Sequence, residues 1–245
     1  MASPSLTIGA RVGRIEGPSK VSGRTLFAGD ISLPGMLAGK ILRSPYPHAL
    51  IRKINVSAAW QIPGVKAIVT GQDQPGMLMG KILRDMPVLC WDRVRYIGDR
   101  VAAVAAETVE AAERAIALIQ VEYEVLPAVF NPLEAMELDA PVLHDNVSAY
   151  DGAPLQRLAT DVHNGQTRLA WRKGDVDEGF QRADVVMDHS VWMPSRHQGY
   201  IAPYPSGVAI DNDGRVQAWC SSKAPFRARI QFCLLYTSPS PRDRG

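Results

Sequence analysis

The sequence has few cysteines, no long apolar run and almost no charge imbalance. Its three cysteines, Cys90, Cys220 and Cys233, are widely spaced without a CxxC pair, so they can build neither an iron–sulfur cluster nor a structural zinc site. We expect reduced, packed thiols. No window approaches the ~18 apolar residues of a membrane span, and the N-terminus lacks the basic and apolar regions of a signal peptide. These absences favour a cytoplasmic chain without a membrane span.

Two ligand classes are disfavoured by what is missing. The net charge is only +2 over 245 residues, and no Lys/Arg cluster is interleaved with aromatic residues, so nucleic acid is not expected to bind. No GxGxxG motif follows a strand pattern, which argues against a nicotinamide dehydrogenase. The 46% hydrophobic content is that of a folded chain with one large or two modest domains.

The clearest local pattern is that of residues 94–127, which read VRYIGDRVAAVAAETVEAAERAIALIQVEYEVLP. Two short β-type runs, 94–96 and 101–106, flank Gly98 and Asp99. Glycine supplies the positive φ that a tight turn needs, so this pattern predicts a β-hairpin.

A helix and a strand are predicted next. Thr108 can cap the helix, and its apolar residues recur at helical spacing, namely at Val109, Ala112, Ile116 and Ile119. In residues 121–125, apolar residues alternate with Glu122 and Glu124, which is typical of a half-buried strand. The two glutamates could suggest a catalytic pair, but the alternation places both on the solvated face.

Further elements are predicted on either side of this segment. Before it, we expect strands at 36–42, 49–54 and 65–69 and a short helix near 57–61. After it, Asp175 and Glu178 have the spacing of a capping box, which would start a short helix with Phe180 and Ala183 facing the core. Strands are expected at 185–192, 207–210 and 216–220, the last two forming a hairpin around the turn at 212–214.

Four phrases of the chain carry a family resemblance when they are taken together and in order. They are RIEGPSKVSGRTLFAGDISLPGMLAGKILRSPYPHALI from Arg14, IPGVKAIVTGQD from Ile62, the segment 94–127, and KGDVDEGFQRADVVMDHS from Lys173. This combination resembles the molybdopterin-binding large subunit of the aldehyde oxidase and xanthine dehydrogenase family. The resemblance implies an α+β fold, with an α/β hammerhead domain followed by the truncated start of a molybdopterin-binding domain.

The domain organisation that we expect has five parts. They are an N-terminal extension (1–19), the hammerhead domain (20–132), a linker (133–172), the beginning of the molybdopterin-binding domain (173–232) and a non-native tail (233–245). The tail begins CLLYTSPSPRD, which looks like a translated sequencing adapter. We therefore expect residues from Cys233 onward to be disordered and the chain to be an N-terminal fragment. A genuine Pro/Ser-rich terminus is the alternative.

The family resemblance also implies an activity and partners. Its members hydroxylate an aldehyde, an N-heterocycle or a related carbon centre with oxygen from water, using molybdenum on a pterin cofactor. Electrons leave through iron–sulfur and flavin modules. This chain has no cysteine arrangement for iron–sulfur clusters and no dinucleotide-binding motif. The few residues before Arg14 also leave no room for an iron–sulfur or flavin module. We therefore expect a separate iron–sulfur subunit and a separate FAD subunit.

No catalytic residue can be assigned, because the family's general base is a distal glutamate to which no residue of this chain corresponds. The loops that select the substrate would lie beyond Phe232, so the substrate branch stays open. The large subunit could be carbon monoxide dehydrogenase-like or hydroxybenzoyl-CoA reductase-like. A further alternative is a non-catalytic hammerhead scaffold that binds a partner. The fragment by itself is expected to bind no molybdenum cofactor and to be inactive.

Two stretches resemble segments near the family's cofactor. In residues 196–209, Ala202, Pro203 and Tyr204 stand where the family often has glutamate, proline and histidine. In residues 219–229, Lys223 stands where many members have a glutamine. The candidate cofactor-binding residues are therefore Lys223, Gln198 and His197, and no metal ligand is predicted. The alternatives are a surface lysine after a strand and a histidine hydrogen-bonded within the fold.

Overall fold

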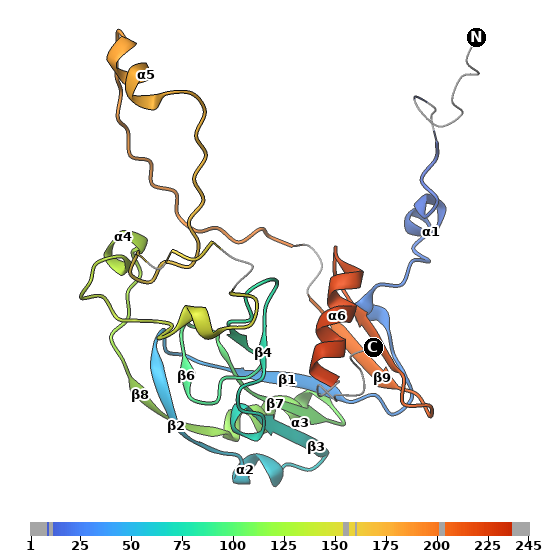
Figure 1. Ribbon diagram of the computed structural model, residues 1–245. Coiled ribbons are helices and arrows are strands. Elements are labelled where there is room, and N and C mark those ends of the chain that lie inside the picture. Colours follow the sequence, from blue (N-terminus) through green and yellow to red (C-terminus); the bar gives the residue numbers. More distant parts are fainter. Residues whose placement is uncertain (1–8, 10–11, 154–156, 160, 201–203, 237–245) are drawn as a thin grey trace. The chain divides into compact units, whose positions relative to one another are not determined.

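The computed structural model describes residue 9 and residues 12–153, 157–159, 161–200 and 204–236 (Figure 1). The chain divides into two compact units. The smaller unit combines Met1–Pro34 with Trp192–Cys233, and the larger unit combines Gly35–Val191 with Leu234–Gly245.

Two three-stranded antiparallel sheets form the larger unit. In the first sheet, the central strand β7 pairs with β1 and β3; in the second, the central strand β2 pairs with β6 and β8. The strands are β1 (Ala38–Arg43), β2 (Ala49–Asn55), β3 (Val65–Thr70), β6 (Arg93–Val94), β7 (Arg100–Ala106) and β8 (Gln120–Val125). The strands predicted at 36–42, 49–54 and 65–69 are confirmed, as is the helix near 57–61, which is α2 (Ser57–Trp60).

Small side chains allow the helix α3 (Val109–Leu118) to pack closely on the first sheet. Its buried residues Ala111, Ala112 and Ala115 belong to one apolar core with Ala102, Val104 and Ala106 of β7. The predicted cap is confirmed, because the Thr108 hydroxyl accepts a hydrogen bond of 3.1 Å from the Ala111 amide. Val109 was expected on the apolar face, but it is 46% exposed, because the buried stripe is centred on the alanines.

The hairpin predicted around Gly98 and Asp99 is wrong, although the turn is present. Gly98 has a φ of 93°, but β6 pairs with β2 and β7 pairs with β1 and β3, so the chain changes sheet at this turn. The buried Asp99 stabilises the corner. Its carboxylate accepts hydrogen bonds from the amides of Arg95 (3.0 Å) and Arg100 (3.2 Å).

The alternation predicted for residues 121–125 is confirmed. Val121 and Tyr123 of β8 are half-buried, whereas Glu122 and Glu124 are exposed, and Glu124 forms an ion pair with Arg52. The two glutamates therefore lie on a solvated face.

The segment predicted as a linker contains short helical elements and covers part of the larger unit. Its Ala153 and Ala159 are buried, and an isolated bridge joins Leu158 and Thr167. A third, two-stranded antiparallel sheet pairs β4 (Leu78–Met79) with β5 (Met86–Pro87). The other small elements of the larger unit are η2 (Gly71–Asp73), α4 (Pro132–Ala135), η3 (Val147–Ala149) and α5 (Val176–Arg182).

Residues 166–191, which we call the arm, carry α5 and are all exposed. Asp175 caps α5 as predicted, accepting hydrogen bonds from the amides of Asp177 and Glu178 at 3.0 and 3.1 Å. Glu178 pairs with Arg182 and does not complete the predicted capping box. Phe180 and Ala183 were expected in a core but are exposed, and no strand forms at 185–192. The reason is that this run pairs with no other strand among the described residues.

The smaller unit contains the predicted hairpin of β9 (Ser206–Ile210) and β10 (Val216–Cys220), which is confirmed as an antiparallel pair. Its other elements are α1 (Gly17–Val21), η1 (Ala28–Asp30), which contacts β9, and α6 (Pro225–Tyr236). The helix continues through residues 233–236, so disorder from Cys233 onward is wrong for these four positions. The rest of the predicted tail, 237–245, lies outside the described residues. Cys90 is buried as expected, but Cys220 and Cys233 are exposed.

Candidate functional site

The candidate cofactor-binding residues His197 and Gln198 lie in an irregular, exposed stretch of the smaller unit. The Nδ1 atom of His197 accepts a 3.0 Å hydrogen bond from the Gly199 amide, and its ring makes an edge contact with Tyr200 at 5.2 Å. Gln198 makes no side-chain hydrogen bond within the described stretch. The imidazole is therefore held by local contacts, while the amide is free to meet a ligand.

Tyr200 also contacts Tyr204, with ring centroids 4.7 Å apart. A hydrogen bond between the two phenols raises the pKa of Tyr204 to about 12. Tyr204 is therefore a neutral hydroxyl near pH 7 and cannot act as a carboxylate or imidazole would at this position. Ala202 and Pro203, the other two altered positions, lie outside the described residues.

Lys223 is exposed in the short connection between β10 and α6. The neighbouring Ser222 hydroxyl accepts a 3.1 Å hydrogen bond from the Ala224 amide, which organises the start of the helix. An ammonium group before a helix N-terminus favours negative charge there. No contact among the described residues joins Lys223 to His197 or Gln198, so the structure does not assemble the three into one site.

The chemistry of these candidates fits the oxygen atoms of a cofactor better than it fits a metal. Lys223 and the Gln198 amide can donate hydrogen bonds to phosphate or carbonyl oxygens. Within the described ranges, no three His, Cys, Asp or Glu side chains are grouped so that they could hold a metal ion. The residues present are therefore compatible with a phosphate-bearing cofactor held through its oxygens.

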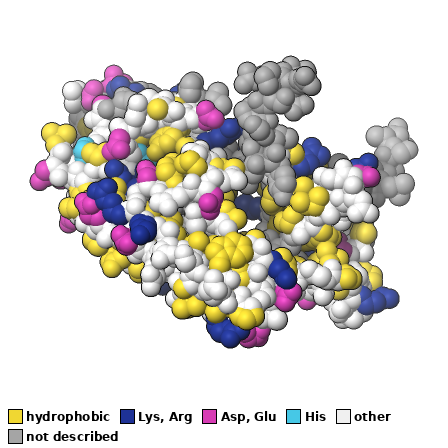
Figure 2. All heavy atoms as spheres, turned by 90° about the horizontal axis from the view of Figure 1, so that it is seen from below, with side chains coloured by type: hydrophobic (Ala, Val, Ile, Leu, Met, Phe, Trp, Pro, Cys, Tyr) yellow, Lys and Arg dark blue, Asp and Glu magenta, His cyan; other side chains and the backbone are white. Residues whose placement is uncertain are grey.

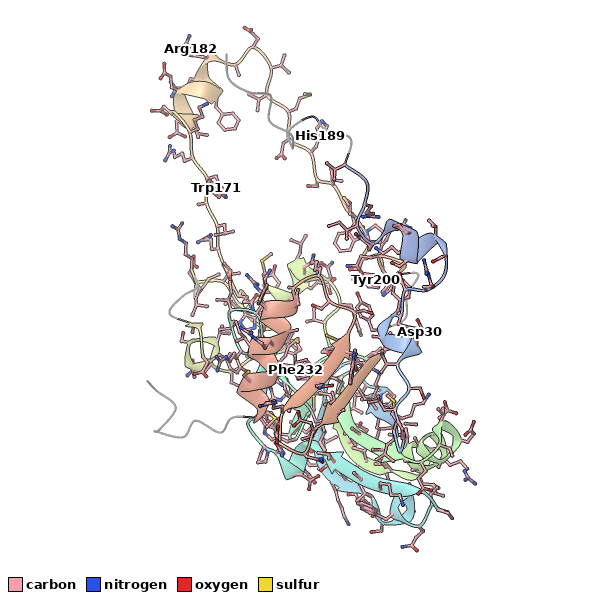
Figure 3. The ribbon with its side chains drawn as sticks, turned by 90° about the vertical axis from the view of Figure 1, so that its right-hand side faces the viewer. Asp30, Trp171, Arg182, His189, Tyr200 and Phe232 are labelled. Carbon is pink, nitrogen blue, oxygen red and sulfur yellow. The ribbon has the colours of Figure 1, made fainter. Side chains whose placement is uncertain are left out.

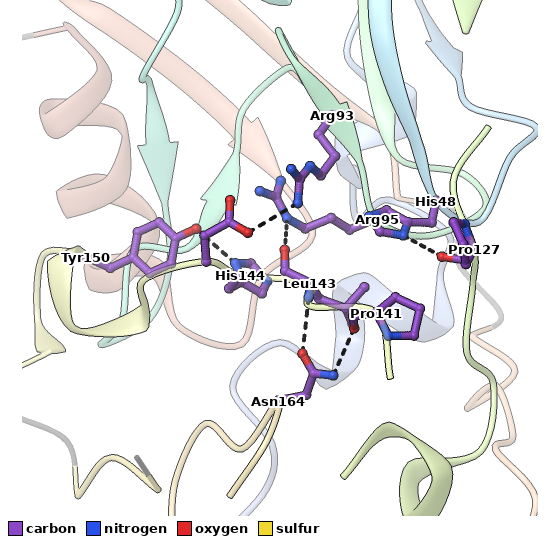
Figure 4. A network of polar contacts seen from close by, with 10 residues as sticks. His48, Arg93, Arg95, Pro127, Pro141, Leu143, His144, Tyr150 and Asn164 are labelled. Carbon is purple, nitrogen blue, oxygen red and sulfur yellow. Dashed lines mark hydrogen bonds and ion pairs between the residues drawn. The ribbon is translucent and has the colours of Figure 1, made fainter. Parts of the chain in front are cut away.

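The polar network of the larger unit was not found by the sequence analysis (Figure 4). Asn164, with a φ of 54°, accepts a hydrogen bond from the Leu143 amide at 3.1 Å and donates to the carbonyls of Ala135 and Pro141 at 2.9 and 3.0 Å. The Arg95 Nε donates to the Leu143 carbonyl at 2.7 Å. These bonds fasten the predicted linker to Arg95, directly after β6, and to itself. Side-chain bonds between residues so far apart in sequence leave no local pattern.

Titratable groups in this unit are shifted chiefly by burial. Burial raises the pKa of the Cys90 thiol, and the nearby Asp99 carboxylate raises it further, so this cysteine is a packed thiol and not a nucleophile. Burial lowers the pKa of His144, assisted by the Arg95 charge. The His144 Nδ1 lies 2.9 Å from the Tyr150 hydroxyl. Beside this pair is a cavity of about 160 Å³, with Leu83, Asp85 and Gln166 in its wall.

The arm exposes large apolar side chains (Figure 3). Trp171 and His189 lie on the two limbs that lead to and from α5, and Arg182 lies at the end of that helix. Trp171 is 94% exposed and Met187 76% exposed. On the face shown in Figure 2, basic and acidic side chains are interspersed. No helix in the described part of the chain is long and apolar enough to cross a membrane.

Two family models match the chain. Residues 22–127 match the aldehyde oxidase and xanthine dehydrogenase a/b hammerhead domain, and residues 160–241 match the molybdopterin cofactor-binding domain.

Relatives and a solved structure agree with these matches. The chain is 39% identical to a probable xanthine dehydrogenase subunit of Bacillus subtilis (strain 168), covering 94% of this chain and 29% of the relative. It is 31% identical to the nicotinate dehydrogenase large molybdopterin subunit of Eubacterium barkeri, covering 94% of this chain and 51% of the relative. A structure of reconstituted CO dehydrogenase from Oligotropha carboxidovorans superposes with a TM-score of 0.73 at 27% identity, covering 93% of this chain and 29% of that one.

The chain thus spans between about a third and a half of the length of these relatives. The matched regions include the β-sheets and α3 of the larger unit, and the hairpin and α6 of the smaller unit. By sequence, domain content and fold, the chain belongs to the aldehyde oxidase and xanthine dehydrogenase family, as an α+β chain with an α/β hammerhead domain followed by the start of a molybdopterin-binding domain.

Proposed function

We propose that this chain is the N-terminal part of a molybdenum hydroxylase large subunit. The whole protein would oxidise an aldehyde, an N-heterocycle or a related small molecule with oxygen derived from water. The observation that carries the proposal is the combination of the two domain matches in family order. The probable xanthine dehydrogenase subunit and the nicotinate dehydrogenase subunit support an N-heterocycle as the substrate class.

The exposed arm supports the view that the rest of a large subunit is needed to cover it. Every residue of the arm is exposed, including Trp171, Val185 and Met187. Apolar surface of this kind marks a place where another polypeptide packs. We therefore infer that the chain alone is aggregation-prone, binds no molybdenum cofactor and is inactive.

In the complete subunit, the molybdenum cofactor would supply the redox chemistry, and this chain would help to hold it. Lys223 would donate a hydrogen bond to a cofactor oxygen, where a glutamine is common in the family. An ammonium can donate but cannot accept, so it suits an anionic oxygen and would replace only half of what an amide does. Gln198 could bind a second oxygen, while His197 would hold the backbone on either side of Gln198 by accepting a hydrogen bond from the Gly199 amide.

The proposed partners are a separate iron–sulfur subunit and a separate FAD subunit, which would accept the electrons in turn. Neither a cysteine arrangement for clusters nor a dinucleotide fingerprint occurs in this chain. Co-purification of the complete subunit from its native source tests this directly. Iron, acid-labile sulfide and FAD should be recovered with it, and a complex with molybdenum but neither iron nor flavin would contradict the assignment.

Sequencing the native locus past the Phe232 codon tests whether the chain is a fragment. We expect an open reading frame that continues through a complete molybdopterin-binding region, with a distal glutamate. A stop codon soon after the Gly245 codon in native DNA would instead favour a non-catalytic hammerhead scaffold. Metal analysis of the purified chain gives a second test, since stoichiometric molybdenum would contradict its proposed inability to bind the cofactor.

The role of Lys223 can be tested in the complete subunit by the content of bound pterin and molybdenum. Lys223→Ala should lower cofactor retention, Lys223→Gln should keep most of it, and Lys53→Ala, at an exposed position of β2, should have no effect. Equal cofactor content in all three variants would show that Lys223 is a surface residue that does not bind the cofactor.

A further inference from the structure

The larger unit contains a second pocket, remote in sequence from the proposed cofactor residues. It has a volume of about 270 Å³ and is lined by residues from three segments of the chain, namely 47–48, 95–97 and 128–130, together with Leu143. Its wall is apolar for the most part, with Ile97, Val129 and Phe130 among its side chains. Ile97 and Phe130 are 63% and 77% exposed, so apolar surface continues around the opening.

A guanidinium group with unused donors stands in this wall. The Arg95 Nε donates to the Leu143 carbonyl at 2.7 Å, but its Nη1 and Nη2 atoms have no acceptor among the described residues. These two nitrogens carry four N–H donors in a planar fork that matches a carboxylate. Arg95 is half-buried, where a cation without an anionic partner is costly.

Carboxylates lie near Arg95, but none of them bonds its Nη atoms in the described part of the chain. Asp99 accepts a 3.0 Å hydrogen bond from the Arg95 amide, and Asp145 lies 3.7 Å from the Nη1 atom of Arg93. The Nη donors of Arg95 are therefore left for a ligand of the pocket.

A third feature of the wall is an unsatisfied imidazole nitrogen. His48 is 3% exposed, and its Nδ1 lies 2.7 Å from the Pro127 carbonyl oxygen (Figure 4). Because a carbonyl only accepts, Nδ1 must carry the proton. The buried Nε2 then has no partner among the described residues. This nitrogen is an acceptor, so it offers no hydrogen bond to a carboxylate and contributes only to the wall of the pocket.

From the free Nη donors of Arg95 and the apolar wall around them we propose that the pocket binds a carboxylate attached to an apolar body. Arg95 binds the carboxylate through its free Nη atoms, and Phe130, Ile97 and Val129 contact the apolar body. The carboxylate could belong to a small-molecule acid or to an acidic side chain of a protein. This site is independent of the proposed molybdenum chemistry and would remain if that proposal failed.

Isothermal titration of the 245-residue chain with hydrocinnamate tests the proposal, with hydrocinnamamide as the neutral control. Hydrocinnamate should bind saturably and the amide about tenfold or more weakly, since the amide cannot form the charge-assisted pair. The capped dipeptide acetyl-Phe-Glu-amide distinguishes the sources: tighter binding of the dipeptide indicates a protein side chain, and tighter binding of the free acid indicates a small molecule. Absence of saturable binding by either acid, or equal binding of acid and amide, would overturn the proposal.

Single substitutions test whether hydrocinnamate binds in this pocket. Arg95→Gln should weaken hydrocinnamate about tenfold or more, and Arg95→Lys should recover only part of the loss because it keeps the charge without the fork. Phe130→Ala should also weaken binding, and its exposure makes a folding defect unexpected. Arg52→Gln is the control, because it removes an exposed arginine that does not line the pocket. If Arg95→Gln fails to fold, Phe130→Ala still decides, since unchanged affinity in that variant would refute a site in this pocket.

Discussion

The corner at Asp99 offers the sharpest test of how the larger unit is held together. The change to make is Asp99→Ala, which removes both acceptors of the buried carboxylate. The amides of Arg95 and Arg100 would lose bonds of 3.0 and 3.2 Å at the point where the chain passes from one sheet to the other. A hydrogen bond to a charged group contributes roughly 1.5–3 kcal/mol, so two such bonds at the lower end give a loss of about 3 kcal/mol.

Amide hydrogen exchange in β7, followed by mass spectrometry, measures this loss within the larger unit alone. A loss of about 3 kcal/mol lowers the protection factors of the most stable β7 amides roughly 150-fold, if their exchange requires unfolding of the unit. Asp99→Asn should cost about half as much, because the amide keeps one acceptor oxygen and turns an N–H toward the other donor.

The matched control is Asp145→Ala, because Asp145 is in the same unit but is exposed and forms only a long ion pair of 3.7 Å with Arg93. An exposed ion pair of this kind contributes from nothing to about 1 kcal/mol. If Asp99→Ala changed β7 protection no more than Asp145→Ala does, the carboxylate would not be what fixes the corner, and the reasoning from its two hydrogen bonds would be refuted.

Three further predictions concern the same unit. Gly152→Ala should destabilise it by about 2 kcal/mol or more, because φ is +85° and a Cβ would lie 1.9 Å from the Ile82 carbonyl oxygen; urea unfolding checks this against Gly174→Ala, whose Cβ meets no atom within 4 Å. Thr108→Ala should cost about 1 kcal/mol in the same assay through loss of the α3 cap, and an unchanged midpoint would contradict it. His144 has a pKa below its ordinary 6.5 in the folded chain, so its contribution to stability is complete above pH 6.5 and is lost as pH falls through the folded pKa, with a slope of at most about 1.4 kcal/mol per pH unit. In His144→Gln this component should disappear, and an unchanged pH profile would show that other groups cause it.

Elements whose signals lie within a few residues were predicted correctly from the sequence. Predictions that depend on a distant partner strand were wrong. The Thr108 cap, the Asp175 cap and the β9–β10 turn each depend on residues within a few positions, and all three were found. The turn at Gly98 was equally local and was also found. Its pairing was mistaken, because the choice between a hairpin and a change of sheet depends on β1 and β2, which lie more than forty residues earlier.

The strand expected at 185–192 also shows that strand prediction depends on distant partners, because this run has no partner strand among the described residues. Val185, Met187 and Val191 have the composition of a strand, yet the run remains irregular and exposed. Propensity for β-structure reflects packing against neighbouring strands more than an intrinsic backbone preference, so a run without neighbours does not form a ladder. The prediction was therefore incomplete, because it named a strand without naming what would pair with it.

This dependence on neighbours also explains why the candidate cofactor residues could not be assembled from the sequence. His197 and Gln198 follow directly on the unpaired run, and their positions depend on whatever orders it. Lys223, by contrast, is placed by β10 and the start of α6, which form without that run. If the rest of a large subunit pairs with residues 185–192, it should bring His197 and Gln198 into fixed positions while leaving Lys223 where it is. Slower amide exchange at 185–198 in the complete subunit than in this chain, with little change in β10, is the result that this argument requires.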